Sequence, residues 1–384
     1  MKVLYPSSET TPSYGGIGSF TYKIINELVK KYDDYEAVIV TSNQKPSDTF
    51  LHYFKDNKRT KIISLFEHEY KQIYRRDLQF QIKLATKINK IINSEKIDII
   101  HHQTGHSDLF FSLPLISNLP VIMTSHGDIS ALLNIWKNAT LQNINEKMNY
   151  RLGKLLFNEE KYMYKKSDLI TAVAEHVRLN IIKNYHITSD KIITINNFVD
   201  PEKFYFHPGM FEKPYKIGFI GRPYYIKGFY DLIEIINKYN HQDIFEWHLV
   251  TDAELAKKII KTDANIQYYN SIPHSELSKF YDDLDFVFIP SYSEACPTVL
   301  LESLLKGKIC IIRNIVGSQD IVANCSTHVF TNISKLNLPD VVKKYTDNRT
   351  TLFENLKNNR EIIKGRYSMT KIIDDLYHLY KKYS

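Results

Sequence analysis

The chain has 384 residues, of which 43% are hydrophobic and 24% charged, and its formal net charge is +7. This length exceeds what one hydrophobic core usually holds, and the composition excludes a disordered chain, so we expect two globular domains. The three cysteines, Cys296, Cys310 and Cys325, have no CxxC spacing, which argues against a zinc site or a disulfide framework. Residues 1–6 are too short for a secretory signal, and no stretch approaches the roughly 18 apolar residues of a membrane helix, so we expect a cytoplasmic protein.

Short apolar runs alternate with amphipathic segments along the first half of the chain. A predicted strand over Lys2–Tyr5 is followed by a glycine-bearing loop and a predicted helix over Ser19–Lys31. The further predicted strands of this half are Glu36–Thr41, Lys96–His101, Pro120–Thr124, Leu169–Ala172 and Lys191–Ile195. This alternation predicts an α/β domain with a doubly wound parallel sheet.

The pattern breaks at Asp200–Pro214, where prolines and a glycine remove the periodicity. It then restarts, with predicted strands at Lys216–Ile220, Phe245–Val250, Ile266–Tyr268, Asp285–Pro290 and Ile309–Arg313. We therefore predict a first Rossmann-like domain (1–205), a linker (206–214), a second Rossmann-like domain (215–367) and a C-terminal helix (368–384). The helix must dock its apolar face on one domain; periodicity does not say which, and packing back on the N-terminal domain is one option.

Basic residues are dense between Lys55 and Lys96, where they are interleaved with Phe, Tyr and Ile at helical spacing. One interpretation is a solvated helix face over an ordinary core. The other is a basic amphipathic surface that rests on anionic lipid. No motif supports nucleic-acid binding.

The carboxyl ends of parallel strands share one edge of a sheet, where ligands bind. After the first strand, Gly15 and Gly16 let the backbone approach a ligand ahead of a helix, although a tight turn explains them equally well. After the strand that ends at Thr124 come His126 and Gly127. The histidine is either a hydrogen-bonding site residue or a structural one.

The second half carries cations and carboxylates at the same kind of position. Arg222 and Lys227 follow a strand and open a helix, so they can hold a diphosphate, unless they are solvated surface charges. Glu294 and Glu302 stand with seven residues between them, around a helix start at Pro297–Val299 whose N–H groups suit phosphate. A buried Glu capping network is the alternative interpretation of the two carboxylates.

Asp283 and Asp285 have the DxD spacing of metal-dependent transferases. They stand where a helix ends and an apolar strand begins. We therefore interpret Asp285 as a structural residue at the start of the strand, with metal binding as the alternative.

Taken together, these residues resemble the family 4 retaining glycosyltransferases of the GT-B fold, from the first strand to about Val322. Besides the Glu-x7-Glu element, the matching motifs are Asp98–His101, Asp168–Ile170 with Ala174–Glu175, Asn197–Asp200, Ser275–Leu277 and Gly317–Ile321. The resemblance implies two facing Rossmann-like domains with an interdomain cleft. The N-terminal domain would bind the acceptor and the C-terminal domain a UDP-sugar or GDP-sugar donor.

The resemblance also implies four catalytic residues, which are His126, Arg222, Lys227 and Glu294. His126 would contact the transferred sugar, Arg222 and Lys227 would neutralise the diphosphate, and Glu294 would bind the sugar ring. The implied donor-binding residues are Gly15, Gly16, Gly127, Ile272, Cys296, Pro297, Thr298, Val299 and Glu302, of which Glu302 would hold the ribose hydroxyls. Cys296 stands where family members usually have Gly or Ser, and Asn270 where a Gly is common, which leaves the donor open.

The expected activity is retaining, metal-independent transfer of a hexosyl-type sugar without a cofactor, in cell-envelope polysaccharide or glycolipid synthesis. The acceptor would be a lipid-linked molecule or a glycan, with peripheral contact to the inner face of an anionic membrane and no nucleic-acid partner. The alternatives are a sugar-nucleotide epimerase, a sugar-phosphate synthase, or a non-catalytic transferase partner. Acceptor recognition is expected at Thr10–Tyr14, Gln103–Asp108 and Asp128–Ile144.

Overall fold

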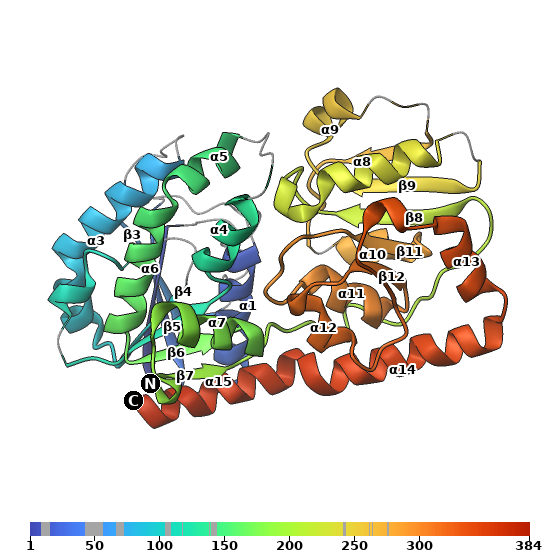
Figure 1. Ribbon diagram of the computed structural model, residues 1–384. Helices are drawn as coiled ribbons and strands as arrows, with labels where there is room; N and C mark the ends of the chain where they lie inside the picture. Colours follow the sequence, from blue (N-terminus) through green and yellow to red (C-terminus); the bar gives the residue numbers. More distant parts are fainter. Residues whose placement is uncertain are drawn as a thin grey trace. The chain divides into compact units, whose positions relative to one another are not determined.

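The computed structural model describes residues 1–8, 16–42, 57–66, 73–103, 109–116, 118–137, 139, 144–240, 243–260, 262, 264–274 and 276–384. The chain forms two compact units (Figure 1). Unit 1 comprises Met1–Ser130, Leu152–Asn197 and Ile372–Ser384, and unit 2 comprises Ala131–Arg151 and Phe198–Lys371. Residues 206–214, expected as a linker, belong to unit 2 by their contacts, and Phe211 in this segment is buried in its core.

Unit 1 is built on a seven-stranded parallel sheet of order β3-β2-β1-β4-β5-β6-β7. Its strands are β1 (Lys2–Ser7), β2 (Glu36–Thr41), β3 (Thr60–Ser64), β4 (Ile99–Gln103), β5 (Val121–Ser125), β6 (Leu169–Ala172) and β7 (Ile192–Thr194). The central strands are buried on both faces, which is why they are nearly continuous apolar runs. The predicted doubly wound α/β sheet is confirmed.

Strand β3 was not predicted. The stretch from Lys55 to Lys96 was interpreted as having helical spacing throughout, whereas among its described residues Thr60–Ser64 form β3 and Ile73–Glu95 form α3. β3 lies at the edge of the sheet and is only half-buried, so its pattern of apolar residues is weak.

The other helices that the structure describes in the N-terminal half are α1 (Gly16–Lys31), α4 (Ile129–Lys137), α5 (Ile144–Arg151), α6 (Gly153–Lys166) and α7 (Glu175–Tyr185). The C-terminal helix α15 (Met369–Tyr383) returns to unit 1 from Ile372 onward. Its Tyr380 is fully buried, and the Tyr380 hydroxyl hydrogen-bonds Tyr5 at 3.0 Å and the His101 ring at 2.5 Å. The last helix of the chain thereby contributes to the core around its first strand.

Unit 2 contains a six-stranded parallel sheet of order β10-β9-β8-β11-β12-β13. Its strands are β8 (Tyr215–Ile220), β9 (Phe245–Val250), β10 (Ile266–Tyr269), β11 (Phe286–Ile289), β12 (Ile309–Arg313) and β13 (His328–Phe330). Its helices include α8 (Phe229–Lys238), α9 (Ala253–Ile259), α10 (Leu277–Asp282), α11 (Thr298–Lys306), α12 (Val316–Val322), α13 (Leu338–Thr346) and α14 (Arg349–Tyr367). The short edge strand β13 was not predicted.

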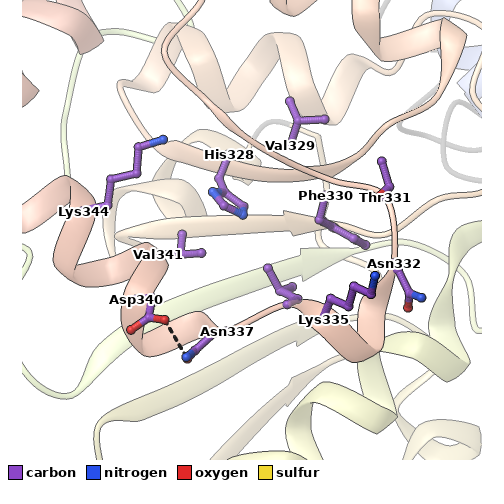
Figure 2. A pocket seen from close by; sticks show the side chains of 11 residues that line it. His328, Val329, Phe330, Thr331, Asn332, Lys335, Asn337, Asp340, Val341 and Lys344 are labelled. Atoms are coloured by element: carbon purple, nitrogen blue, oxygen red, sulfur yellow. Dashed lines mark hydrogen bonds between the residues drawn. The ribbon is translucent and has the colours of Figure 1, made fainter.

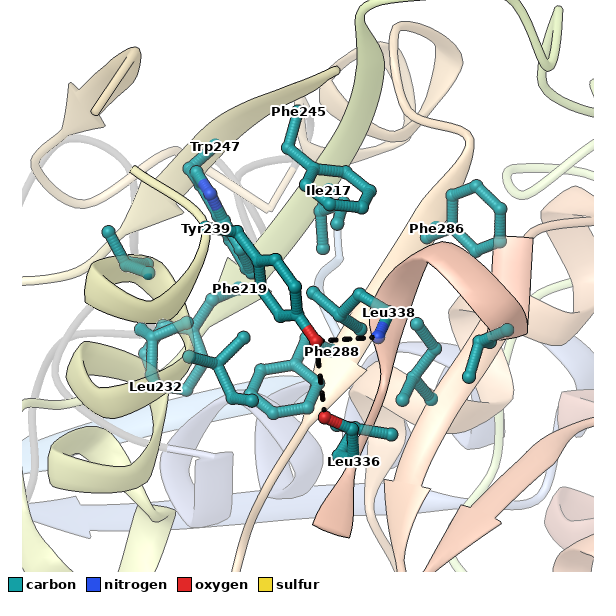
Figure 3. Packing of buried hydrophobic residues seen from close by; sticks show 14 of the residues in the cluster. Ile217, Phe219, Leu232, Tyr239, Phe245, Trp247, Phe286, Phe288, Leu336 and Leu338 are labelled. Atoms are coloured by element: carbon teal, nitrogen blue, oxygen red, sulfur yellow. Dashed lines mark hydrogen bonds between the residues drawn. The ribbon is translucent and has the colours of Figure 1, made fainter. Parts of the chain in front are cut away.

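Aromatic side chains fill the core of unit 2 (Figure 3). Trp247 and Phe288 are almost completely buried, and a side chain of this size stabilises the fold by about 1.5–3 kcal/mol through burial. Tyr239 keeps its polar tip satisfied: its hydroxyl donates to the Leu336 carbonyl and accepts from the Leu338 N–H, each at 3.3 Å. This packing holds the sheet whose strand ends carry the predicted residues.

Within the ranges given above, no helix combines the length and apolar character that a bilayer-spanning segment requires.

Candidate functional site

The predicted cations of unit 2 lie on the loop between β8 and α8. Arg222 is exposed, and its guanidinium carbon lies 5.9 Å from the centre of the Tyr224 ring. Lys227 ends the short 3-10 helix Tyr225–Lys227, and Gly228 follows with a φ of 67°, which favours glycine. Gly228 packs against Pro290, the first residue after the neighbouring strand β11.

The loop after β11 brings Glu294 to Lys227. Lys227 Nζ lies 2.7 Å from Glu294 Oε1, and the Ser291 hydroxyl donates to the same oxygen at 2.7 Å. The Glu294 side chain is 14% exposed and that of Lys227 35%. The pair therefore lies at the surface of the unit, and the Lys227 side chain is partly exposed to solvent. The structure thus joins two of the four predicted catalytic residues, and adds Ser291, which sequence reasoning left out.

Three predicted donor-binding residues form the start of α11. Pro297 occupies the N-cap position, and Thr298 and Val299 are the first two helical residues. Backbone N–H groups at such a start have no partner within the helix, and the helix dipole favours an anion there. Cys296, just before them, is buried.

Glu302 lies further along α11 and is buried, with 4% of its surface exposed. Its carboxylate accepts from the Tyr281 hydroxyl at 3.0 Å and pairs with His274 Nε2 at 3.3 Å. Lys203 bonds the other nitrogen of His274. Glu302 therefore takes part in a buried network, which is the alternative interpretation given in the sequence analysis. Ile272, another predicted donor-binding residue, is half-buried and lies two residues before His274.

Of the two carboxylates with DxD spacing, Asp285 bonds the backbone of its own unit. Asp285 is buried, and its two oxygens accept from the backbone N–H groups of Phe211 at 2.8 Å and Lys216 at 2.9 Å. These bonds tie the segment before β8 to the start of β11, so the structural interpretation of Asp285 is confirmed. Among the residues that the structure describes, no group of three or more His, Cys, Asp or Glu side chains is placed to hold a metal.

In unit 1, His126 follows β5. Its Nε2–H donates to the Gln103 side-chain oxygen at 2.7 Å, and its ring packs edge-on against Phe20 of α1, with 4.8 Å between ring centres. Gly127 has a φ of 148°, a conformation that favours glycine. Gly16 is the first residue of α1, whereas Gly15 lies outside the described residues.

Behind His126 lies a buried relay of polar side chains. Gln103 Nε2 donates to His101 Nε2 at 3.3 Å, so His101 carries its proton on Nδ1 and donates it to the Tyr380 hydroxyl. Burial, with smaller effects of His102 and His126, lowers the pKa of His101 to about 3. His101 is therefore neutral near pH 7 and orients its neighbours through hydrogen bonds.

Gln103 is the first residue of a segment in which acceptor recognition is expected, whereas His101 and Tyr380 were not predicted as site residues. His101 and Gln103 stand at alternate positions of β4, so their side chains share one face of the sheet, and Thr124 of the neighbouring strand β5 hydrogen-bonds His101 at 2.7 Å. This alternation at the carboxyl end of a predicted strand was a usable signal. Tyr380 had none, because its link to His101 spans 279 residues.

A pocket of about 400 Å³ lies elsewhere in unit 2, between β13 and α13 (Figure 2). Its lining includes His328, Lys335 and Lys344, and Asn337 donates to Asp340 at 2.7 Å on its rim. It contains none of the predicted site residues, which gather at the other strand ends.

Comparisons with known proteins agree with the fold. A family model described as Glycosyltransferase Family 4 matches residues 14–203, and one described as Glycosyl transferases group 1 matches residues 201–361. The whole chain is 27% identical to an uncharacterised glycosyltransferase of Methanocaldococcus jannaschii, of which the match covers 99%. The fold is similar to sucrose-phosphate synthase of Thermosynechococcus elongatus (TM-score 0.79, 14% identity, 99% of this chain and 98% of that one). It is also similar to HepE of Anabaena in complex with UDP-glucose (TM-score 0.71, 13% identity, 100% of both chains).

Proposed function

The chain belongs to the family 4, group 1 glycosyltransferases of the GT-B fold, and on this premise we propose that it transfers a hexosyl-type sugar from a nucleotide diphosphate sugar to an acceptor with retention of anomeric configuration. The observation that carries the proposal is the Lys227–Glu294 contact beside the start of α11. HepE, a structural neighbour, is solved with UDP-glucose, which supports a nucleotide diphosphate sugar as donor.

In the proposed reaction, the bond between the anomeric carbon and the diphosphate breaks and negative charge grows on the leaving group. Lys227 and Arg222 stabilise that charge, together with the N–H groups at the start of α11. Glu294 holds the Lys227 ammonium in place and faces the electron-poor sugar. In unit 1, His126 hydrogen-bonds a sugar hydroxyl. The Gln103 side-chain oxygen accepts from Nε2 of His126 and so keeps that nitrogen protonated. The leaving phosphate takes the acceptor's proton as the new bond forms on the same face, so no metal or cofactor enters.

A panel of UDP- and GDP-sugars in a thermal-shift assay tests donor binding, because a ligand at 100 times its Kd stabilises the folded state by about 2.7 kcal/mol. One class of donor should raise the melting temperature, and Lys227→Ala should remove the shift. Lys238→Ala is the matched control, because Lys238 is a lysine of α8 bonded to the Leu336 carbonyl and should leave the shift intact. A panel without any shift contradicts the proposal.

Product analysis separates transfer from the alternatives. Retention gives a product whose anomeric proton has the coupling of the donor sugar, in the presence of EDTA. An epimerase releases a changed sugar nucleotide without a larger acceptor, and a sugar-phosphate synthase requires a sugar phosphate as acceptor. A non-catalytic partner keeps the fold and releases no nucleotide diphosphate.

We further propose that unit 1 contacts an anionic membrane through a surface on α3 and the nearby 3-10 helix Leu113–Leu115. Leu78 and Ile82 of α3 are each 51% exposed, and Leu115 is 46% exposed. Lys87 and Lys90 are exposed elsewhere on the same helix, and a helix that carries both exposed apolar side chains and cations suits the headgroup region of anionic lipid. This surface supports a lipid-linked or envelope-glycan acceptor.

Co-sedimentation with phosphatidylserine vesicles tests the surface. We expect binding that weakens as salt rises, because the lysine contribution is screened. The double variant Leu78→Ser/Ile82→Ser should lose it, while Leu179→Ser, which changes a 53% exposed leucine on α7, should not. Binding that ignores both salt and the double variant contradicts this assignment.

A further inference from the structure

Arg313, the last residue of β12, is 9% exposed and bonds two separate segments of unit 2. Its Nε donates to the Pro290 carbonyl oxygen at 2.9 Å, directly after β11. A terminal nitrogen of the same guanidinium pairs with the Asp231 carboxylate in the first turn of α8. One side chain thus holds the end of one strand and the beginning of one helix.

Aromatic rings complete the enclosure of Arg313. The guanidinium carbon lies 4.1 Å from the centre of the Tyr292 ring and 5.1 Å from that of Phe330. The Tyr292 hydroxyl also hydrogen-bonds Asp231, and the Tyr292 ring stacks on that of Tyr225, with 4.7 Å between ring centres. The planar guanidinium suits this mixture of stacking and directed bonds, which a lysine does not reproduce.

The two segments flank the loops that carry Lys227 and Glu294, since Asp231 lies four residues after Lys227 and Pro290 four residues before Glu294. Gly228, next to Lys227, packs so closely on Pro290 that an added Cβ would lie 2.2 Å from the Pro290 oxygen. The Tyr292 N–H donates to the Ile226 carbonyl at 2.8 Å, which adds a second connection beside the first. Any movement of one loop relative to the other therefore changes the distance between Lys227 and Glu294.

We propose that Arg313 is a positioning residue that fastens these two loops and so sets the geometry of the Lys227–Glu294 pair. Arg313 itself need not touch the donor. The fastening stands on the contacts above, while its catalytic consequence rests on the proposed transferase function.

The test uses the full chain with Arg313→Ala, Arg313→Lys and Asp231→Asn. The matched control is Arg360→Ala. Arg360 lies in the same unit, where its guanidinium donates to the carbonyls of Phe204, Leu305 and Pro201. Loss of the Arg360 side chain should lower the melting temperature without loosening the two loops, because these three carbonyls lie outside them.

Two readouts separate positioning from plain stability. In hydrogen exchange, Arg313→Ala should speed the amides of Ile226, Lys227 and Tyr292 by at least about tenfold, and Arg360→Ala should leave them unchanged. In transfer assays below the melting temperature, Arg313→Ala should lower kcat at least about tenfold more than Arg360→Ala, with part of the loss restored by millimolar guanidinium. Arg313→Lys and Asp231→Asn should fall between the parent and Arg313→Ala.

Equal exchange rates in Arg313→Ala and Arg360→Ala overturn the fastening, whether or not the protein transfers a sugar. Faster exchange with the same kcat as Arg360→Ala overturns its catalytic consequence. An absence of transfer by the parent chain contradicts the proposed function and leaves the exchange result to decide the fastening. If Arg313→Ala does not fold, Asp231→Asn carries both measurements, because it keeps the volume of the side chain and removes the ion pair.

Discussion

The two units hold their candidate residues by different physical means. In unit 1, His126 stands at the end of a buried relay of uncharged groups, through Gln103 and His101 to Tyr380. In unit 2, Lys227 and Glu294 form a partly exposed ion pair on two loops, and a buried arginine fastens those loops.

The difference indicates what each region has to do. Neutral hydrogen bonds fix the orientation and proton position of an imidazole, which suits contact with sugar hydroxyls. Charged loops offer a strong local field to a diphosphate, but a field acts productively only when its charges are preorganised. We therefore expect substitutions in unit 2 to change the rate, and those in the relay to change stability and pH dependence.

The largest effect should follow from Lys227→Ala. Loss of a preorganised cation beside the leaving group should lower kcat at least about 100-fold, because transition-state charge loses its stabilisation. Glu294→Gln should cause a similar loss, since Lys227 then lacks its anchoring charge.

Initial-rate kinetics on the folded variants measure these losses. Glu254→Gln, which changes an exposed glutamate of α9, serves as the control for Glu294→Gln and should keep parental kinetics. Activity of Lys227→Ala and Glu294→Gln within tenfold of the parent would falsify the assignment of the charged site.

The second prediction concerns the pH dependence of stability in unit 1. His101 has a pKa lowered to about 3, so the unfolded chain binds more protons below pH 6.5 and acidification destabilises the fold. Desolvation of the half-buried Glu160 raises its pKa to about 7, so the folded state binds more protons and acidification stabilises it. From pH 7 to 5 each group contributes about 2 kcal/mol, with opposite sign.

The two contributions should nearly cancel in the parent chain and separate in variants. Between pH 7 and 5, His101→Gln should lose about 2 kcal/mol less stability than the parent, and Glu160→Gln about 2 kcal/mol more. Exchange of the slowest amides in the unit 1 strands reports the free energy of unfolding of this unit. Parallel pH profiles for the two variants would contradict the assigned proton positions.

The sequence predicted most of the fold because the central strands are apolar runs separated by helices. It identified both ends of β2, β6, β9 and β12. It missed the edge strands β3 and β13, which are short and partly exposed, so neighbouring strands rather than their own pattern define them. The Lys227–Glu294 contact could be anticipated from two strand-end loops in adjacent strands.

The supporting contacts were harder to predict from sequence. Arg313 was seen only as the end of a strand, because its partners Asp231 and Pro290 are 82 and 23 residues away. Tyr380 reaches His101 only after the chain has returned to unit 1. Such pairings depend on the packing of whole elements, which local periodicity does not describe.

The third prediction tests the far end of the relay. Tyr380→Phe removes the hydroxyl that accepts from the His101 Nδ1–H, and this N–H then stays buried without that acceptor. The loss should destabilise unit 1 by about 1–3 kcal/mol. Tyr377→Phe on the same helix removes a hydroxyl bonded to the exposed Asp34 and should stay within about 0.5 kcal/mol. Urea unfolding followed by amide exchange compares them, and equal losses would show that burial of the relay does not matter.

The smallest effect should come from an ion pair without enclosure. Lys258 and Glu254 on α9 lie 2.9 Å apart, but their side chains are 68% and 83% exposed, so water screens them. A double-mutant cycle should give a coupling of about 0.3–0.5 kcal/mol that disappears in high salt. The Arg313–Asp231 pair also joins one positive and one negative side chain, but these are only 10% and 13% exposed. A double-mutant cycle on this pair should therefore give a larger coupling that does not depend on salt. If the exposed pair matched the buried one, enclosure by Tyr292 and Phe330 would not be what makes Arg313 an effective fastening.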